Sequence, residues 1–78
     1  MPIYFISYHA IPLPSNIEYG ISKGAYVNGW VDANNIEDAR TIVYTKIEGL
    51  NWQVISLEDE KEISKEYFKY KFEIKNKN

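Results

Sequence analysis

The chain has 78 residues, a net charge of −2 at pH 7 and no cysteine. Its length predicts one domain, and the lack of cysteine excludes disulfides and thiolate zinc sites, as expected of a cytoplasmic protein. The apolar start of the chain has no basic residue before it and is interrupted by Pro12 and Pro14, so we expect neither a signal peptide nor a membrane span.

The first expected strand covers residues 3–11, IYFISYHAI, a β-branched and aromatic run that ends at Pro12. Side chains alternate along a strand, which places Tyr4 and Tyr8 on one face and Phe5 and His9 on the other. Both faces are largely apolar, which indicates a central strand. His9 is the only histidine, which favours a structural role over metal binding.

Residues 12–23, PLPSNIEYGISK, predict a loop of about a dozen residues, a length at which loops are often functional. Its apolar side chains are candidates for a contact surface: Ile17, Tyr19 and Ile21. The equal alternative is that these side chains fold back and cover an edge of the sheet.

Residues 24–33, GAYVNGWVDA, predict the second strand. One face carries small residues suited to packing against a helix, namely Ala25, Val27, Gly29 and Val31. The other face carries Tyr26, Asn28, Trp30 and Asp32. Asn28-Gly29 is also a typical two-residue hairpin turn. Because its arms would be shorter than the usual ~5–6 residues, we favour a continuous strand with a close backbone contact at Gly29.

A helix is expected to begin at Asn34 or Asn35, since Asn is a preferred N-cap and acids follow three residues later. Its apolar stripe recurs at spacings of three and four and comprises Ile36, Ala39, Ile42, Val43, Ile47 and Leu50. Gly49 is expected to end the helix in a left-handed conformation, with Leu50 packing back. Arg40 and Tyr44 lie off the stripe and should face solvent.

Two further strands are expected after the helix. The first covers residues 51–57, NWQVISL, and the acidic run at residues 58–62 then predicts a solvated turn and not a metal or acid–base site. In the last strand Phe68, Tyr70, Phe72 and Ile74 alternate with Lys69, Lys71, Glu73 and Lys75. This alternation predicts a half-buried strand with a charged outer face.

A resemblance is carried by YHAIP at residues 8–12, Tyr19-Gly20, GAYVNGW at residues 24–30, and Trp52. Over residues 3–57 the chain resembles a group of small uncharacterised bacterial and phage proteins with the pattern YFxSYxAIP…YG…GGAYVNCW…GW. Cysteine is common in that group at the position of Gly29, which disfavours the hairpin turn. Lys23 replaces a glycine of the pattern, Asn51 precedes Trp52, and the C-terminal part is shorter. The resemblance implies no activity.

These elements predict one α+β domain over residues 1–75, with a frayed tail at 76–78. We expect the order β-β-α-β-β, an antiparallel-rich sheet, and one helix packed on one face. The other face should then carry Tyr4, Tyr8, Tyr26 and Trp30. Glycine-rich phosphate loops, paired catalytic carboxylates, a nucleophile with its base and zinc spacings are all missing from the sequence, so we expect no enzyme, cofactor or metal.

The pattern favours a small cytoplasmic module that occludes a surface of a larger protein, such as a phage-encoded anti-CRISPR inhibitor of host defence, or an immunity protein. The predicted partner-binding residues are Tyr4, Tyr8, Glu18, Tyr19, Tyr26, Trp30 and Asp32. The alternative is a dimeric domain that sequesters a nucleotide-like ligand near Ser22 to Gly24, with Lys23 as its basic group. Single-strand nucleic-acid binding through Lys69 and Lys71 is a third hypothesis, which the interleaved acids disfavour. A homodimer is left open, and no membrane partner is expected.

Overall fold

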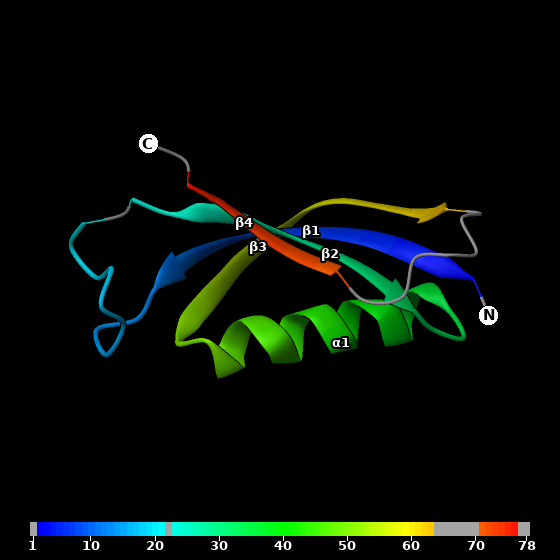
Figure 1. Ribbon diagram of the computed structural model, residues 1–78, viewed down its shortest axis with the longest axis horizontal. Helices are drawn as coiled ribbons and strands as arrows, with labels where there is room; N and C mark the ends of the chain where they lie inside the picture. Colours follow the sequence, from blue (N-terminus) through cyan, green and yellow to red (C-terminus); the bar gives the residue numbers. More distant parts are fainter. Residues whose placement is uncertain (1, 22, 64–70, 77–78) are drawn as a thin grey trace.

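A computed structural model describes residues 2–21, 23–63 and 71–76 of the chain. Within these residues the elements are β1 (Ile3–Pro12), β2 (Ala25–Asp32), α1 (Ile36–Gly49), β3 (Trp52–Ile63) and β4 (Lys71–Asn76). The strands form one antiparallel sheet in the order β3-β1-β2-β4, and α1 lies along one face of it (Figure 1). The predicted α+β class is confirmed.

β1 is a central strand, as predicted, and pairs with β2 on one side and β3 on the other. Ile3 is paired with Asp32 of β2 and with Ile63 of β3. Since β2 and β3 flank β1, α1 connects them by crossing over β1 on one face of the sheet. The register between β1 and β3 shifts at Ser7/Tyr8 and again at His9/Ala10, as at β-bulges.

The acidic run at residues 58–62 belongs to β3, so the predicted solvated turn is wrong. β1 begins at Ile3, and its neighbour continues to Ile63 to pair with it along its whole length. β3 lies at an edge of the sheet, where charged side chains stay in water while their backbone is paired. The run of charged residues at 58–62 therefore did not indicate where this strand ends.

The core lies between α1 and the face of the sheet that β1 and β2 turn toward it. Val27 and Val31 of β2 and Val43 of α1 are almost fully buried. A Cβ atom built at Gly29 would lie 2.8 Å from Cγ2 of Val43, so the helix packs directly against the backbone of β2 there. Asn28 and Gly29 lie inside β2, which rules out the hairpin turn and confirms the continuous strand.

The two ends of α1 differ in how well they were predicted. The side chain of Asn35 accepts a hydrogen bond from the backbone N–H of Asp38 at 2.8 Å, which confirms an asparagine N-cap. At the other end Gly49 is the last helical residue, and the left-handed residue is Asn51, with φ of 66°. The predicted role of Gly49 is therefore wrong. Leu50 is exposed and does not pack back, because the chain turns at Asn51 instead.

The last strand can be compared with the prediction only in part, because residues 68–70 lie outside the described residues. β4 continues to Asn76, which is paired with Ala25 of β2. The strand thus extends one residue into the tail that we expected to fray, since β2 offers it a partner at that position. Phe72 is partly buried against the core, next to Gly29, as its place in the alternation predicted.

Candidate functional site

The sheet face opposite α1, which we call the outer face, carries pairs of rings from β1 and β2. Phe5 and Trp30 have ring centroids 5.0 Å apart, and the rings of His9 and Tyr26 are 5.7 Å apart. Lys61 of β3 lies at the same level, with its Nζ 5.4 Å from the centroid of Phe5. All four rings are half-buried. Of the predicted partner-binding residues, Tyr26, Trp30 and Asp32 belong to this face.

Tyr4 and Tyr8 lie on the helix side of the sheet, so their predicted place on the same face as Tyr26 and Trp30 is wrong. They are only 8% and 7% exposed and belong to the core cluster. The register pairs Tyr4 with Val31 and Tyr8 with Val27. Paired residues share a face, and these valines face α1. Phe5 and His9 take the places that we had assigned to the two tyrosines.

A signal for this arrangement was present in β1. Ser7 and His9 alternate with Phe5 on one face, whereas the other face carries no polar residue except tyrosines. The face with the more polar residues was therefore the better candidate for the side away from the helix. Ser7 is nevertheless only 6% exposed, because it lies between the rings of Phe5 and His9 along the strand.

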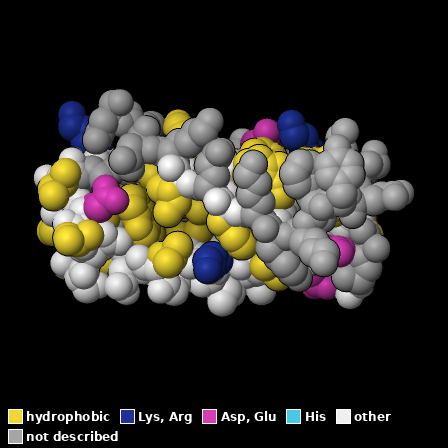
Figure 2. All heavy atoms as spheres, in the orientation of Figure 1, with side chains coloured by type: hydrophobic (Ala, Val, Ile, Leu, Met, Phe, Trp, Pro, Cys, Tyr) yellow, Lys and Arg dark blue, Asp and Glu magenta, His cyan; other side chains and the backbone are white. Residues whose placement is uncertain are grey.

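The loop between β1 and β2 holds the most exposed large apolar side chains of the described residues. Ile17 is 90% exposed, Ile21 74% and Tyr19 56%. We call these three residues the loop patch. The alternative that they fold back over a sheet edge is therefore wrong. Figure 2 shows hydrophobic side chains at the end of the molecule where this loop lies (Figure 1), beside an acidic side chain.

Although its apolar side chains are exposed, the loop is well braced by hydrogen bonds. The Asn16 side-chain amide donates to the backbone oxygens of Leu50 and Asn51, at 3.2 and 3.1 Å. Its side-chain oxygen accepts from the N–H of Glu18 at 2.9 Å. Backbone turns connect Asn16 to Leu13, Tyr19 to Asn16 and Ile21 to Glu18, and Leu13 donates to Asn51. The loop is thereby attached to the residues that follow α1. The predicted residue Glu18 is half-buried at the base of the loop patch.

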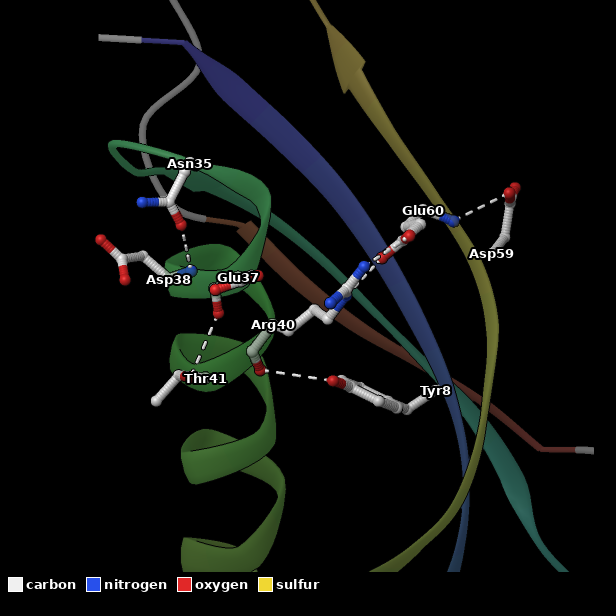
Figure 3. A network of polar contacts seen from close by, with 8 residues as sticks. All are labelled: Tyr8, Asn35, Glu37, Asp38, Arg40, Thr41, Asp59 and Glu60. Atoms are coloured by element: carbon white, nitrogen blue, oxygen red, sulfur yellow. Dashed lines mark hydrogen bonds and ion pairs between the residues drawn. The ribbon is translucent and has the colours of Figure 1, made fainter.

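A polar network joins α1 to the sheet on the helix side (Figure 3). Arg40 donates from Nε and Nη2 to the two carboxylate oxygens of Glu60, at 2.6 and 2.8 Å. This hydrogen bonding raises the pKa of Arg40 and lowers the pKa of Glu60. The Tyr8 hydroxyl donates to the backbone oxygen of Arg40 at 3.5 Å, and burial raises the pKa of Tyr8. Arg40 is thus an ion-pair residue between helix and sheet and not simply solvent-facing, as we had predicted.

His9 lies against the backbone at the start of β2. A Cβ atom built at Gly24 would lie 3.0 Å from its Nε2 atom, and that nitrogen is buried with no hydrogen-bond partner among the described residues. The ring packs on Tyr26. Over residues 2–21, 23–63 and 71–76 no three His, Cys, Asp or Glu side chains come together where they could hold a metal ion.

The two alternative functions depend partly on residues that the structure does not describe. Ser22, at the predicted nucleotide site, and Lys69, in the predicted nucleic-acid site, lie outside the described residues. In the part of the chain that is described, no helix has the length and apolar character needed to cross a membrane.

Comparison with known proteins gives no match: no family model, curated protein or solved structure corresponds to this chain.

Proposed function

We propose that this protein is a small interaction module that occludes a surface of a larger protein, as an anti-defence inhibitor or an immunity protein would. The observation that supports this proposal is the loop patch. Full burial of an isoleucine side chain is worth roughly 1.5–3 kcal/mol, yet Ile17 and Ile21 are 90% and 74% exposed. Two such side chains on one loop provide a large gain in free energy to any partner that covers them.

The bracing of the loop makes it suited to binding. Flexible loops lose conformational entropy when a partner orders them, and a pre-organised loop avoids most of that loss. Here Asn16 fixes the base of the loop through bonds to Leu50 and Asn51, and successive turns hold Tyr19 and Ile21. The apolar side chains are thus presented in one arrangement before a partner arrives.

The shape and charge of the site define the partner surface that it fits. The molecule measures 39 × 20 × 19 Å, and the loop lies at one end of its long axis (Figure 1). Apolar side chains that protrude from a narrow end fit an apolar concavity. Glu18 stands at the base of the loop patch, and the chain has a net charge of −2. A basic rim around that concavity would therefore speed association.

A differential capture experiment tests this proposal. The tagged protein is incubated with host lysate, and the retained proteins are identified by mass spectrometry for three forms: wild type, Ile17→Ser/Ile21→Ser, and Ile55→Ser/Leu57→Ser. The last is a matched control, because Ile55 and Leu57 are exposed apolar residues of β3. We expect one major protein that wild type and the control retain and the loop variant loses. Equal retention by all three forms, or no specific retention by wild type, would contradict the proposal.

A further inference from the structure

β3 is the longest strand of the described residues and lies at an edge of the sheet. It has 12 residues, and β1 pairs with it along its whole length on one side. In an antiparallel ladder every second residue of an edge strand turns its N–H and C=O away from the neighbouring strand. These outward groups are a template on which a strand of another chain can pair.

Two apolar side chains make such pairing at β3 more favourable. Ile55 and Leu57 are 49% and 40% exposed. A strand added beside β3 would cover part of both side chains and gain the free energy of that burial. A long edge strand with exposed apolar residues therefore associates with other chains unless its own structure prevents it.

We propose that β3 carries a built-in block that prevents a further strand from pairing with its free edge. The block has two geometric parts, a side chain that occupies a backbone N–H of the edge and a pair of bulges that interrupt the edge. Acidic side chains at the same place add to it.

The first part of the block is a hydrogen bond between the backbone and a side chain. The N–H of Glu60 donates to Oδ1 of Asp59 at 2.9 Å. Figure 3 shows this contact on the side of β3 that faces away from β1, so the N–H is one of the outward groups of the edge. An added strand can bond to this N–H only by displacing the Asp59 carboxylate.

The second part of the block is the pair of bulges in β3. Ser7 and Tyr8 are neighbours in β1, but their partners in β3 are two positions apart, which leaves Glu58 as an additional residue. Ile55 is additional in the same way at the second bulge. Each bulge bends the strand and interrupts the regular spacing of its backbone groups. The free edge of β3 is thereby divided into short stretches.

Charge reinforces this geometry. Glu58 and Asp59 are both exposed, and a strand placed beside them would remove part of their contact with water, which is unfavourable for a carboxylate. A basic strand would compensate for these charges. The Asp59 contact and the bulges, in contrast, oppose a strand of any sequence.

Two variants that lose the same two charges separate geometry from charge. The open variant combines Asp59→Ala with deletion of Glu58, which removes the side-chain acceptor and one bulge. The charge-matched variant, Asp59→Asn/Glu58→Ala, keeps an oxygen acceptor at residue 59 and keeps the bulge. Sedimentation equilibrium over a concentration series compares both with wild type. We expect the open variant to self-associate with a dissociation constant lower by about tenfold or more than that of the charge-matched variant, which should sediment like wild type.

Hydrogen exchange locates the association. In the associated open variant the backbone amides of β3 should exchange more slowly than in the dilute protein. Circular dichroism verifies that each variant is folded. Asp59→Ala alone, which leaves the length of the chain unchanged, tests the first part of the block separately. Its Glu60 amide should exchange about threefold or more faster than that of Asp59→Asn, because it loses one hydrogen bond.

The proposal would be overturned by an open variant that associates no more strongly than the charge-matched one, or by an association that does not protect β3. Equal exchange of the Glu60 amide in Asp59→Ala and Asp59→Asn would also contradict it. The loop patch lies outside β3 and is unchanged in every variant, so these results do not depend on the proposed function.

Discussion

The two faces of this sheet are built from different kinds of side chain. On the helix side, β2 supplies Ala25, Val27, Gly29 and Val31, and the helix approaches until a single added Cβ at Gly29 would meet Val43 at 2.8 Å. On the outer face the same strand supplies Tyr26 and Trp30, which pack sideways on rings of β1. One face is close-packed against a second layer, while the other is covered by its own side chains.

The difference between the two faces shows that β2 determines which side of the sheet packs against α1. β1 is largely apolar on both sides, and apart from its tyrosines only Ser7 and His9 distinguish one face from the other. β2 has one small face and one large face, and a helix packs closely only on the small one. Antiparallel pairing then transfers this choice to β1, because directly paired residues share a face. Tyr8 accompanies Val27 under α1, and Phe5 accompanies Trp30 on the outer face.

The largest expected effect contrasts two neighbours on β1. Ile6 is fully buried on the helix side, and Phe5 is half-buried on the outer face. Ile6→Ala should lower the free energy of unfolding by about 4 kcal/mol, because it leaves a cavity that packed neighbours cannot fill. Phe5→Ala should cost about 2 kcal/mol, since water already reaches part of the ring. Urea unfolding measures both changes in the free energy of unfolding.

A Phe5→Ala cost equal to that of Ile6→Ala would remove the contrast between the faces. It would mean that the outer face is as well covered as the helix side.

An intermediate loss of stability is expected at Gly29, where the close packing of α1 on β2 depends on the absence of a side chain. Gly29→Ala places a Cβ within 3.0 Å or less of Val43 and near Phe72, so the helix or the strand must shift. We expect a loss of about 2 kcal/mol in the urea midpoint analysis. Gly49→Ala adds the same methyl group at the end of α1, where no atom lies within 4 Å. That control should be neutral or slightly stabilising, and similar losses in both variants would show that α1 does not pack closely on β2.

The sequence allowed β2 and the start of α1 to be predicted because their signals are local. Small and large residues alternate in β2, and Asn35 caps the helix through a contact only three residues away. The faces of β1 were assigned wrongly because they depend on the register with β2. A tight turn between β1 and β2 would have fixed that register. A long loop separates the two strands instead, so the sequence does not determine which face of β1 lies on the helix side.

The residues of the candidate sites also divide into those that a local pattern predicts and those that depend on contacts distant in the chain. The outer-face positions of Tyr26 and Trp30 followed from β2 alone, while Phe5 was missed because its face depends on pairing. For Ile17 the sequence left exposure and burial equally open. The exposure of the loop side chains follows from the attachment of Asn16 to Leu50 and Asn51. These residues lie 34 and 35 positions away from Asn16 in the chain, so no local pattern predicts the contact.

The smallest expected effect concerns the ion pair of Arg40 and Glu60, the polar contact that holds α1 to β3 on the helix side. The hydrogen bonds from Arg40 lower the pKa of Glu60 below its usual value of 4.5. The stabilisation is therefore fully present above pH 4.5 and is lost as the pH falls through the lower, folded-state pKa. Glu60→Gln should lose stability at neutral pH and show a shallower decline between about pH 5 and pH 2 than wild type. Glu48→Gln removes another carboxylate of α1, one that is exposed, and it serves as the control. Urea unfolding across this pH range measures the slopes. A Glu60→Gln slope equal to that of wild type would show that this pair does not link the helix to the sheet in solution.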